Sequence, residues 1–180
     1  MRIEVLGHVR LITNEGAEVQ VAERHLRLLL AALAAADGEP VPADTLIDRL
    51  WNGDLPANPK KVLQAKLSRL RTALDQARLG ARERLTHTPA GYQLILDTDT
   101  FDAGRFKGAV EDARRMGASS QKVQALTDAL TLWRGAPFGD MADEIWLAPA
   151  VAELHDVRGD AFEALVETLL ERGDPQGAIN

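Results

Sequence analysis

The sequence contains no cysteine and no long uncharged apolar run. Without cysteine, disulfide bridges and zinc sites with thiolate ligands are excluded. No stretch approaches the roughly 18 apolar residues that a membrane-spanning helix needs. The first residues also lack the apolar core of a signal peptide. These absences favour a cytoplasmic protein with no membrane partner.

Nothing in the sequence indicates an enzyme, a metal site or a cofactor site. No glycine-rich phosphate loop occurs, and Ser68 lies in a run of arginine and leucine without a nucleophile elbow. The four histidines are scattered over separate predicted elements and lack metal-ligand spacing. Trp133 and Trp146 are interpreted as core anchors, because large aromatic side chains are usually buried.

The net charge of −6 conceals an uneven distribution of charge. Residues 1–96 contain 13 Lys and Arg against 11 Asp and Glu, whereas residues 97–180 contain 8 against 16. The two parts therefore carry net charges of +2 and −8. Residues 60–84 alone hold eight basic residues against two acidic ones. This concentration of positive charge suits contact with DNA phosphates, and the acidic half should then lie away from the DNA.

The basic segment is centred on a predicted amphipathic helix over residues 58–77. Asn58 suits its N-cap, and Pro59 suits the first helical position. One apolar stripe is formed by Leu63, Leu67, Leu70 and Leu74. The face opposite the stripe and its flanks carry Lys61, Val62, Gln64, Ala65, Lys66, Ser68, Arg69 and Thr72. A helix with this profile fits the major groove of DNA. The alternative is a core helix with a solvated charged face.

The neighbouring segments predict a winged helix-turn-helix domain around this helix. Strands over residues 2–6, 9–12 and 18–21 would form an N-terminal sheet, followed by helices over residues 23–36 and 43–51. Two further strands, over residues 84–88 and 92–96, would be joined by the turn Pro89-Ala90-Gly91 as a wing. We expect this hairpin to pair with the N-terminal sheet, which would bury Tyr92 and Leu94.

The second half of the chain is predicted to be helical throughout. Residues 97–102 mark the domain boundary. Their aspartates lack the glycine and glutamate spacing of a calcium loop, so a linker with Thr100 or Asp102 as a helix cap is favoured. Helices are expected over residues 101–116, 119–133 and 148–172. Residues 176–180 look like the start of another helix. We therefore expect a helical-hairpin array that is incomplete at the C-terminus.

Several short motifs resemble known domains in a characteristic order. Residues 45–51 (Thr-Leu-Ile-Asp-Arg-Leu-Trp), 63–74 and 91–94 (Gly-Tyr-Gln-Leu) look like the OmpR/PhoB-type winged helix. Residues 101–106 (Phe-Asp-Ala-Gly-Arg-Phe), 129–135 and 146–153 are similar to the bacterial transcriptional activator domain. Together they resemble the Streptomyces antibiotic regulatory protein family. The resemblance implies an α+β winged helix-turn-helix domain over residues 1–97 and an all-α, tetratricopeptide-like domain over residues 98–180.

The resemblance also implies a function. Members of this family are transcriptional activators of secondary-metabolite genes that bind promoter direct repeats and recruit RNA polymerase. Direct repeats would imply a head-to-tail pair of molecules on the DNA. On this chain the DNA contacts would fall on Lys60, Lys61, Val62, Ala65, Lys66, Ser68, Arg69, Thr72, Thr86, His87 and Thr88. The alternative is a protein-binding helical-repeat adaptor whose winged helix does not read DNA.

Individual roles follow from the chemistry of these side chains. We expect Lys61, Lys66 and Arg69 to contact phosphate or guanine, with Arg69 the best candidate for bidentate base reading. Val62 and Ala65 could contact thymine methyl groups. The wing lacks the arginine that is often found near its tip in this family, because His87 and the Pro89-Ala90 turn stand there instead.

Overall fold

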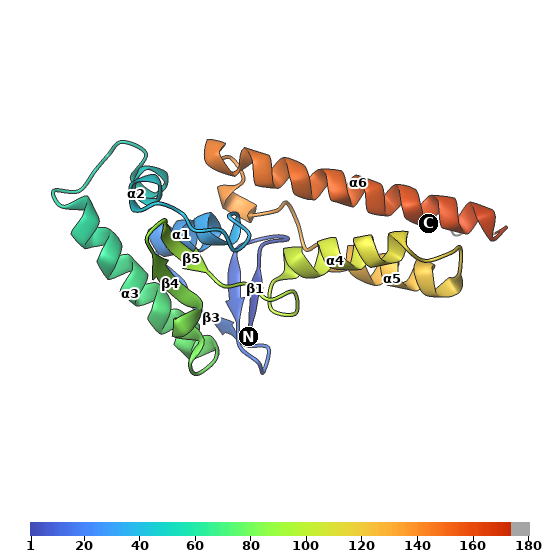
Figure 1. Ribbon diagram of the computed structural model, residues 1–180, viewed down its shortest axis with the longest axis horizontal. Helices are drawn as coiled ribbons and strands as arrows, with labels where there is room; N and C mark the ends of the chain where they lie inside the picture. The colour runs from blue at the N-terminus through green and yellow to red at the C-terminus, as the bar shows by residue number, and fades with distance from the viewer. Residues whose placement is uncertain (174–180) are drawn as a thin grey trace.

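The first half of the molecule packs a small sheet against three helices (Figure 1). A computed structural model describes residues 1–173 of the chain. The antiparallel sheet has the order β1-β2-β3, and its strands are β1 (Arg2–Glu4), β2 (Arg10–Ile12) and β3 (Glu18–Val19). The helices are α1 (Arg24–Ala34), α2 (Ala43–Trp51) and α3 (Pro59–Ala77). The strands and helices predicted for this half are all present, each within a few residues of its predicted bounds.

Helix α1 is the centre of this half. Every residue from Leu28 to Ala34 is buried, and α1 packs against both α2 and α3. Four of these residues are leucine and three are alanine, so the helix combines bulky apolar side chains with small ones that let neighbouring elements pack closely. The burial of residues 28–34 on all sides matches their entirely apolar sequence. The other two helices and the sheet are arranged around it.

The wing hairpin forms a separate two-stranded sheet. Strands β4 (Leu85–Thr88) and β5 (Gly91–Leu94) follow a short 3-10 helix, η1 (Ala81–Arg84). Tyr92 and Leu94 are buried, as predicted. The predicted pairing with the N-terminal sheet was wrong, because Tyr92 instead exchanges two backbone hydrogen bonds of 2.8 and 2.9 Å with Val41. Val41 precedes a proline, which restricts it to an extended conformation and leaves it a strand-like edge.

Gly91 makes this close approach possible. Its φ is +140°, and an added Cβ would collide with the carbonyl group of Val41. We expect Gly91→Ala to lower the free energy of unfolding by about 1–3 kcal/mol, through steric overpacking where the wing meets Val41. Urea denaturation would measure this. Gly117→Ala is the control, because a Cβ there meets nothing within 4 Å. Equal stability of the two variants would contradict the predicted clash.

The second half consists of three helices that extend away from the first half (Figure 1). Helices α4 (Asp102–Arg114), α5 (Ser120–Leu130) and α6 (Ala148–Glu171) pack against one another, and two 3-10 turns, η2 (Gly139–Met141) and η3 (Ile145–Leu147), precede α6. The hydroxyl of Ser119 caps α5 by accepting the backbone N–H of Lys122 at 3.2 Å. The predicted helical start at residues 176–180 lies outside the described residues.

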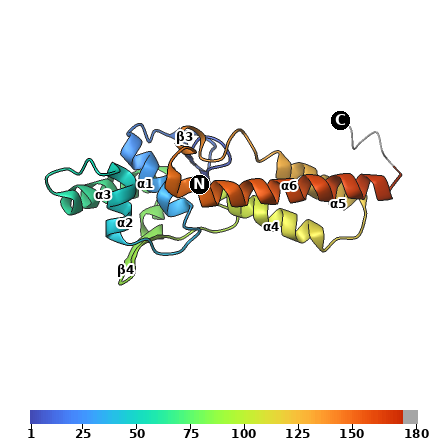
Figure 2. The same cartoon turned by 90° about the horizontal axis from the view of Figure 1, so that it is seen from above.

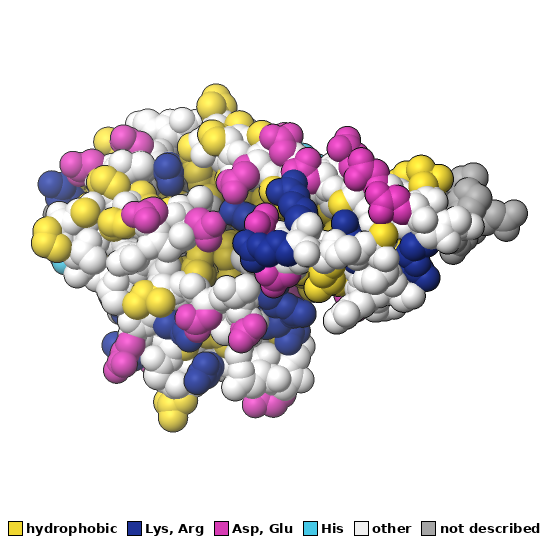
Figure 3. Space-filling model, turned by 45° about the vertical axis from the view of Figure 1, so that its right-hand side comes forward, with side chains coloured by type: hydrophobic (Ala, Val, Ile, Leu, Met, Phe, Trp, Pro, Cys, Tyr) yellow, Lys and Arg dark blue, Asp and Glu magenta, His cyan; other side chains and the backbone are white. Residues whose placement is uncertain are grey.

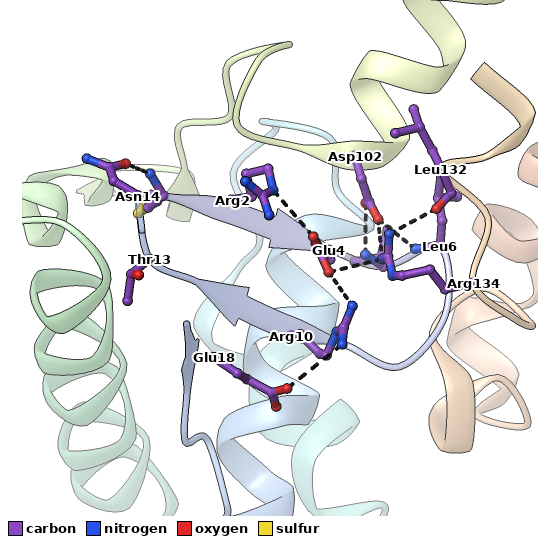
Figure 4. Close-up of polar contacts among 12 residues, drawn as sticks. Arg2, Glu4, Leu6, Arg10, Thr13, Asn14, Glu18, Asp102, Leu132 and Arg134 are labelled. Atoms are coloured by element: carbon purple, nitrogen blue, oxygen red, sulfur yellow. Dashed lines mark hydrogen bonds and ion pairs between the residues drawn. The ribbon is translucent and has the colours of Figure 1, made fainter. Parts of the chain in front are cut away.

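A junction of main-chain and side-chain bonds joins the two halves (Figure 4). The buried Asp102 carboxylate accepts the backbone N–H groups of Val5 at 2.8 Å and Leu6 at 3.1 Å, and the Arg134 guanidinium at 2.6 Å. Arg134 also lies 3.4 Å from the buried carboxylate of Glu4. Burial raises the pKa of the Asp102 carboxyl, and the Arg134 guanidinium and the two backbone donors oppose that rise.

Backbone pairing reinforces the junction. The N–H of Arg134 donates to Leu6 at 2.7 Å, the N–H of Phe138 donates to Val5 at 2.7 Å, and Ile3 forms a parallel bridge with Phe101. The predicted cap role of Thr100 or Asp102 was wrong, because Phe101 occupies the N-cap position and no side chain caps α4 within the described residues. Asp102 is the first helical residue, and its carboxylate faces the turn after β1 instead.

Within residues 1–173, no helix is both long enough and apolar enough to cross a membrane. In the same part of the chain, no group of three or more His, Cys, Asp or Glu side chains is placed to hold a metal ion.

Candidate nucleic-acid interface

The basic helix α3 contains in its own sequence the residues that start it and those that define its buried face. Asn58 is its N-cap and accepts the backbone N–H of Lys61 at 3.1 Å, and Pro59 is the first helical residue. The four predicted stripe leucines, Leu63, Leu67, Leu70 and Leu74, are each at most 1% exposed. Burial of this stripe against the sheet and the other helices fixes which face of α3 points outward.

The outward face lies at one end of the elongated molecule, farthest from α5 and α6 (Figures 1 and 2). Most of the predicted contact residues on α3 are exposed, namely Lys60, Lys61, Ala65, Ser68, Arg69 and Thr72. The two that flank this face on one side, Val62 and Lys66, are half-buried. The structure therefore brings the predicted α3 residues onto one surface, with cations at several positions along it.

Two of the cations on α3 pair with one carboxylate from outside the helix. Glu23, just before α1, accepts a hydrogen bond from Lys66 through Oε1 and one from Arg69 Nη1 through Oε2, the latter at 3.0 Å. The hydrogen bond from Lys66 and that from Arg69 lower the pKa of the Glu23 carboxyl, so it is ionised at neutral pH. Glu23 was not predictable as part of this surface, since 43 residues separate it from Lys66 and no local pattern links them.

Two further α3 side chains hold the wing in place. Gln64 donates a hydrogen bond to the hydroxyl of Tyr92. Arg71 donates from Nε and Nη2 to the carbonyl oxygen of Leu85 at 3.1 and 2.9 Å. These bonds fix the hairpin relative to the outward face of α3. Arg71 belongs to the basic segment of the sequence, but its guanidinium is bound within the domain.

The predicted wing contacts lie on β4. The hydroxyls of Thr86 and Thr88 donate to carbonyl oxygens of the hairpin, at 3.4 Å to Gln93 and 3.2 Å to Gly91. His87 is exposed and lies over the ring of Tyr92, with 4.7 Å between the ring centroids. Seen from above, the hairpin projects from the body of the molecule (Figure 2). Of the three side chains, His87 is therefore the most accessible.

The negative charge of the second half lies on a different part of the molecule from α3. Figure 3 shows a row of acidic side chains along the arm that contains α6. The exposed carboxylates of α6 recur every three or four residues and so share one side of the helix: Glu153, Asp156, Asp160, Glu163, Glu167 and Glu171. Helix α3, by contrast, has five Lys and Arg and a single acidic residue. The positive and negative regions are thus separated along the molecule.

Comparison with known proteins matches both halves of the chain. Residues 16–94 match the family of C-terminal domains of transcriptional regulatory proteins, and residues 96–180 match the bacterial transcriptional activator domain. The transcriptional regulatory protein EmbR of Mycobacterium tuberculosis is 30% identical over 178 residues, which are 97% of this chain and 46% of EmbR. The regulatory protein DnrI of Streptomyces peucetius is 29% identical over 188 residues, which are 99% of this chain and 68% of DnrI.

The chain is similar to regulators of the Streptomyces antibiotic regulatory protein family, with one matching domain in each half. Its resemblance to this family, and the fold class implied by it, are confirmed. A solved structure of the family member EmbR, in complex with a low affinity phosphopeptide, has a TM-score of 0.84 and 28% identity. The match covers 99% of this chain and 48% of that one. The chain thus spans about half the length of EmbR. The domain division after residue 97 and the individual DNA contacts stay predictions.

Proposed function

We propose that this protein binds duplex DNA sequence-specifically and activates transcription, with the outward face of α3 as the reader and the wing beside it. The observation that carries the proposal is the geometry of α3. Its leucine stripe is fully buried, while its opposite face is exposed, basic and lined with small residues. A helix held in this way can enter a major groove without rearrangement. The similarity to transcriptional regulatory proteins supports the same conclusion.

The contacts divide by chemistry. Exposed Lys60 and Lys61, at the start of α3, are assigned to phosphates, and Arg69 to a base edge. Val62 and Ala65 are assigned to thymine methyl groups, as their apolar side chains suggest. The remaining polar contacts would add hydrogen bonds to the backbone of the DNA: Ser68, Thr72, Thr86, His87 and Thr88. Lys66 is bound by Glu23 and is left out of this group.

The proposal also includes the DNA sites and the protein partner that the family implies. Like members of this family, the protein would act in the cytoplasm on promoter direct repeats, bound as a head-to-tail pair, and would recruit RNA polymerase to a secondary-metabolite gene cluster. The row of carboxylates on α6 favours a second candidate function, that of an adaptor that binds a basic protein surface through its acidic half. An adaptor would bind DNA weakly and without sequence preference.

A DNA titration separates the two candidates. We expect fluorescence anisotropy with a duplex from the protein's own upstream region to give saturable binding. Its affinity should fall steeply with salt, because each neutralised phosphate contributes a slope of about −0.9 in log affinity against log salt. Lys61→Ala should make this slope shallower by about 0.9, the contribution of one phosphate. Arg69→Ala should lower specific affinity about 10- to 100-fold, the loss of one good bidentate base contact.

The matched control is Arg105→Ala, which removes an exposed cation from α4, far from α3. It should leave both slope and affinity unchanged. A flat salt dependence in the wild-type protein, or Lys61 and Arg69 variants that match Arg105→Ala, would exclude the DNA-reading function and favour the adaptor.

A further inference from the structure

Glu23 has a backbone position that is fixed independently of its side chain. It is the N-cap residue of α1, and its carbonyl oxygen accepts the N–H groups of Leu26 and Arg27 at 3.0 and 3.2 Å. Its carboxylate makes no cap bond to α1 in the described part of the chain. Both carboxylate oxygens instead reach across to α3, where they bind Lys66 and Arg69. The carboxylate is therefore held at the edge of the proposed reading face.

The two cations bound by Glu23 differ in accessibility. The side chain of Lys66 is 13% exposed, so its ammonium group is held beside Glu23 and largely shielded from solvent. The side chain of Arg69 is 64% exposed. Its bond to Glu23 uses Nη1, and within residues 1–173 no hydrogen bond uses Nε or Nη2. One edge of the guanidinium fork thus remains available for a bidentate partner.

The bonds of Glu23 to Lys66 and Arg69 would affect phosphate contacts and base contacts in opposite ways. Phosphate contacts raise affinity for every sequence, whereas base contacts discriminate between sequences. A carboxylate that neutralises Lys66 removes a phosphate contact. The same carboxylate holds Arg69 in one orientation, so less side-chain freedom is lost when its free edge meets the acceptors of guanine.

On this basis we propose that Glu23 is a positioning residue for sequence discrimination. It orients the Nε–Nη2 edge of Arg69 toward a base and withholds Lys66 from phosphate. This role of Glu23 rests on the proposed DNA-binding function. Glu23 would set the balance between specific and non-specific binding of DNA.

The test compares Glu23→Gln with Glu163→Gln, which removes the same charge from an exposed position on α6. Each protein would be titrated with its upstream duplex and with a scrambled duplex at several salt concentrations. We expect Glu23→Gln to bind the scrambled duplex more tightly. Its salt slope should be steeper by about 0.9, the contribution of one additional phosphate contact by Lys66. Discrimination between the two duplexes should fall about tenfold, because Arg69 loses its fixed orientation.

Double variants assign each effect to its cation. In an Arg69→Ala background, Glu23→Gln should no longer change discrimination but should still steepen the salt slope through Lys66. In a Lys66→Ala background, Glu23→Gln should still lower discrimination but leave the slope nearly unchanged. A residue with a purely structural role would shift neither quantity in this cation-specific way. Matching thermal melting curves would show that the variants are folded.

The possible outcomes are distinguishable. Wild-type protein without saturable, salt-dependent binding would exclude the proposed function itself. If the wild type binds but Glu23→Gln matches Glu163→Gln in slope and discrimination, the role of Glu23 is overturned. If Glu23→Gln binds both duplexes more tightly with discrimination retained, Glu23 is only a competitor of phosphate, and the positioning role is likewise overturned.

Discussion

Replacing Asp102 with alanine is expected to lower the free energy of unfolding by about 3 kcal/mol, the cost of leaving one member of a buried ion pair without its partner. The Asp102 carboxylate is 5% exposed and accepts the Arg134 guanidinium together with the N–H groups of Val5 and Leu6. Alanine would leave these three donors without their acceptor in the junction. The value is at the lower end of the range because Glu4 still lies 3.4 Å from Arg134.

Urea denaturation monitored by circular dichroism would measure this loss as a lower transition midpoint. Asp99→Ala is the matched control, because Asp99 is an exposed aspartate of the same segment. It should change the free energy of unfolding by less than about 0.5 kcal/mol, as is usual for surface positions. Equal midpoints for the two variants would show that the junction network does not stabilise the fold.

Leu67→Ala is expected to lower the free energy of unfolding by about 2–5 kcal/mol, the usual range for removing a buried leucine side chain. Leu67 is completely buried in the stripe that holds α3 against the domain. Its loss removes apolar contacts and leaves a cavity that the surrounding helices can fill only in part. The same change should increase the mobility of the helix that carries the proposed DNA contacts.

Ser68→Ala is the companion variant for stability, since Ser68 is the next residue along the helix and is exposed. Alanine favours helix more than serine does, so this variant should be as stable as the wild type or slightly more stable. Thermal melts of both variants would provide the comparison. A Leu67→Ala midpoint equal to that of Ser68→Ala would contradict the assignment of Leu67 to the core.

Helix α3 was predictable because all its determinants are local. Asn58 and Pro59 mark its start, and the leucine spacing defines its buried face within a single segment. The predicted start of the helix agrees with the observed helix to within one residue. The outward position of Lys61, Ala65 and Arg69 follows from that spacing alone. Sequence patterns determine an amphipathic helix of this length without reference to the rest of the chain.

Other features depend on contacts between distant segments. Tyr92 pairs with Val41 rather than with the N-terminal sheet, and no local pattern distinguishes the two partners. Asp102 has the residue type of a helix cap, but the turn after β1 supplies donors from 96 and 97 positions away in sequence. Glu23 reaches α3 across 43 residues. Such pairings follow from the three-dimensional packing of helices and strands, which one sequence alone does not specify.

The bonded junction between the halves has a consequence for the proposed binding to DNA. Because Arg134, Asp102 and the turn after β1 fix the two halves to each other, their opposite net charges form a rigid electric dipole directed along the molecule. The electric field around a DNA duplex would rotate such a molecule before contact, with α3 leading and α6 trailing. A larger fraction of encounters would then begin in a productive orientation, which would raise the association rate at low ionic strength.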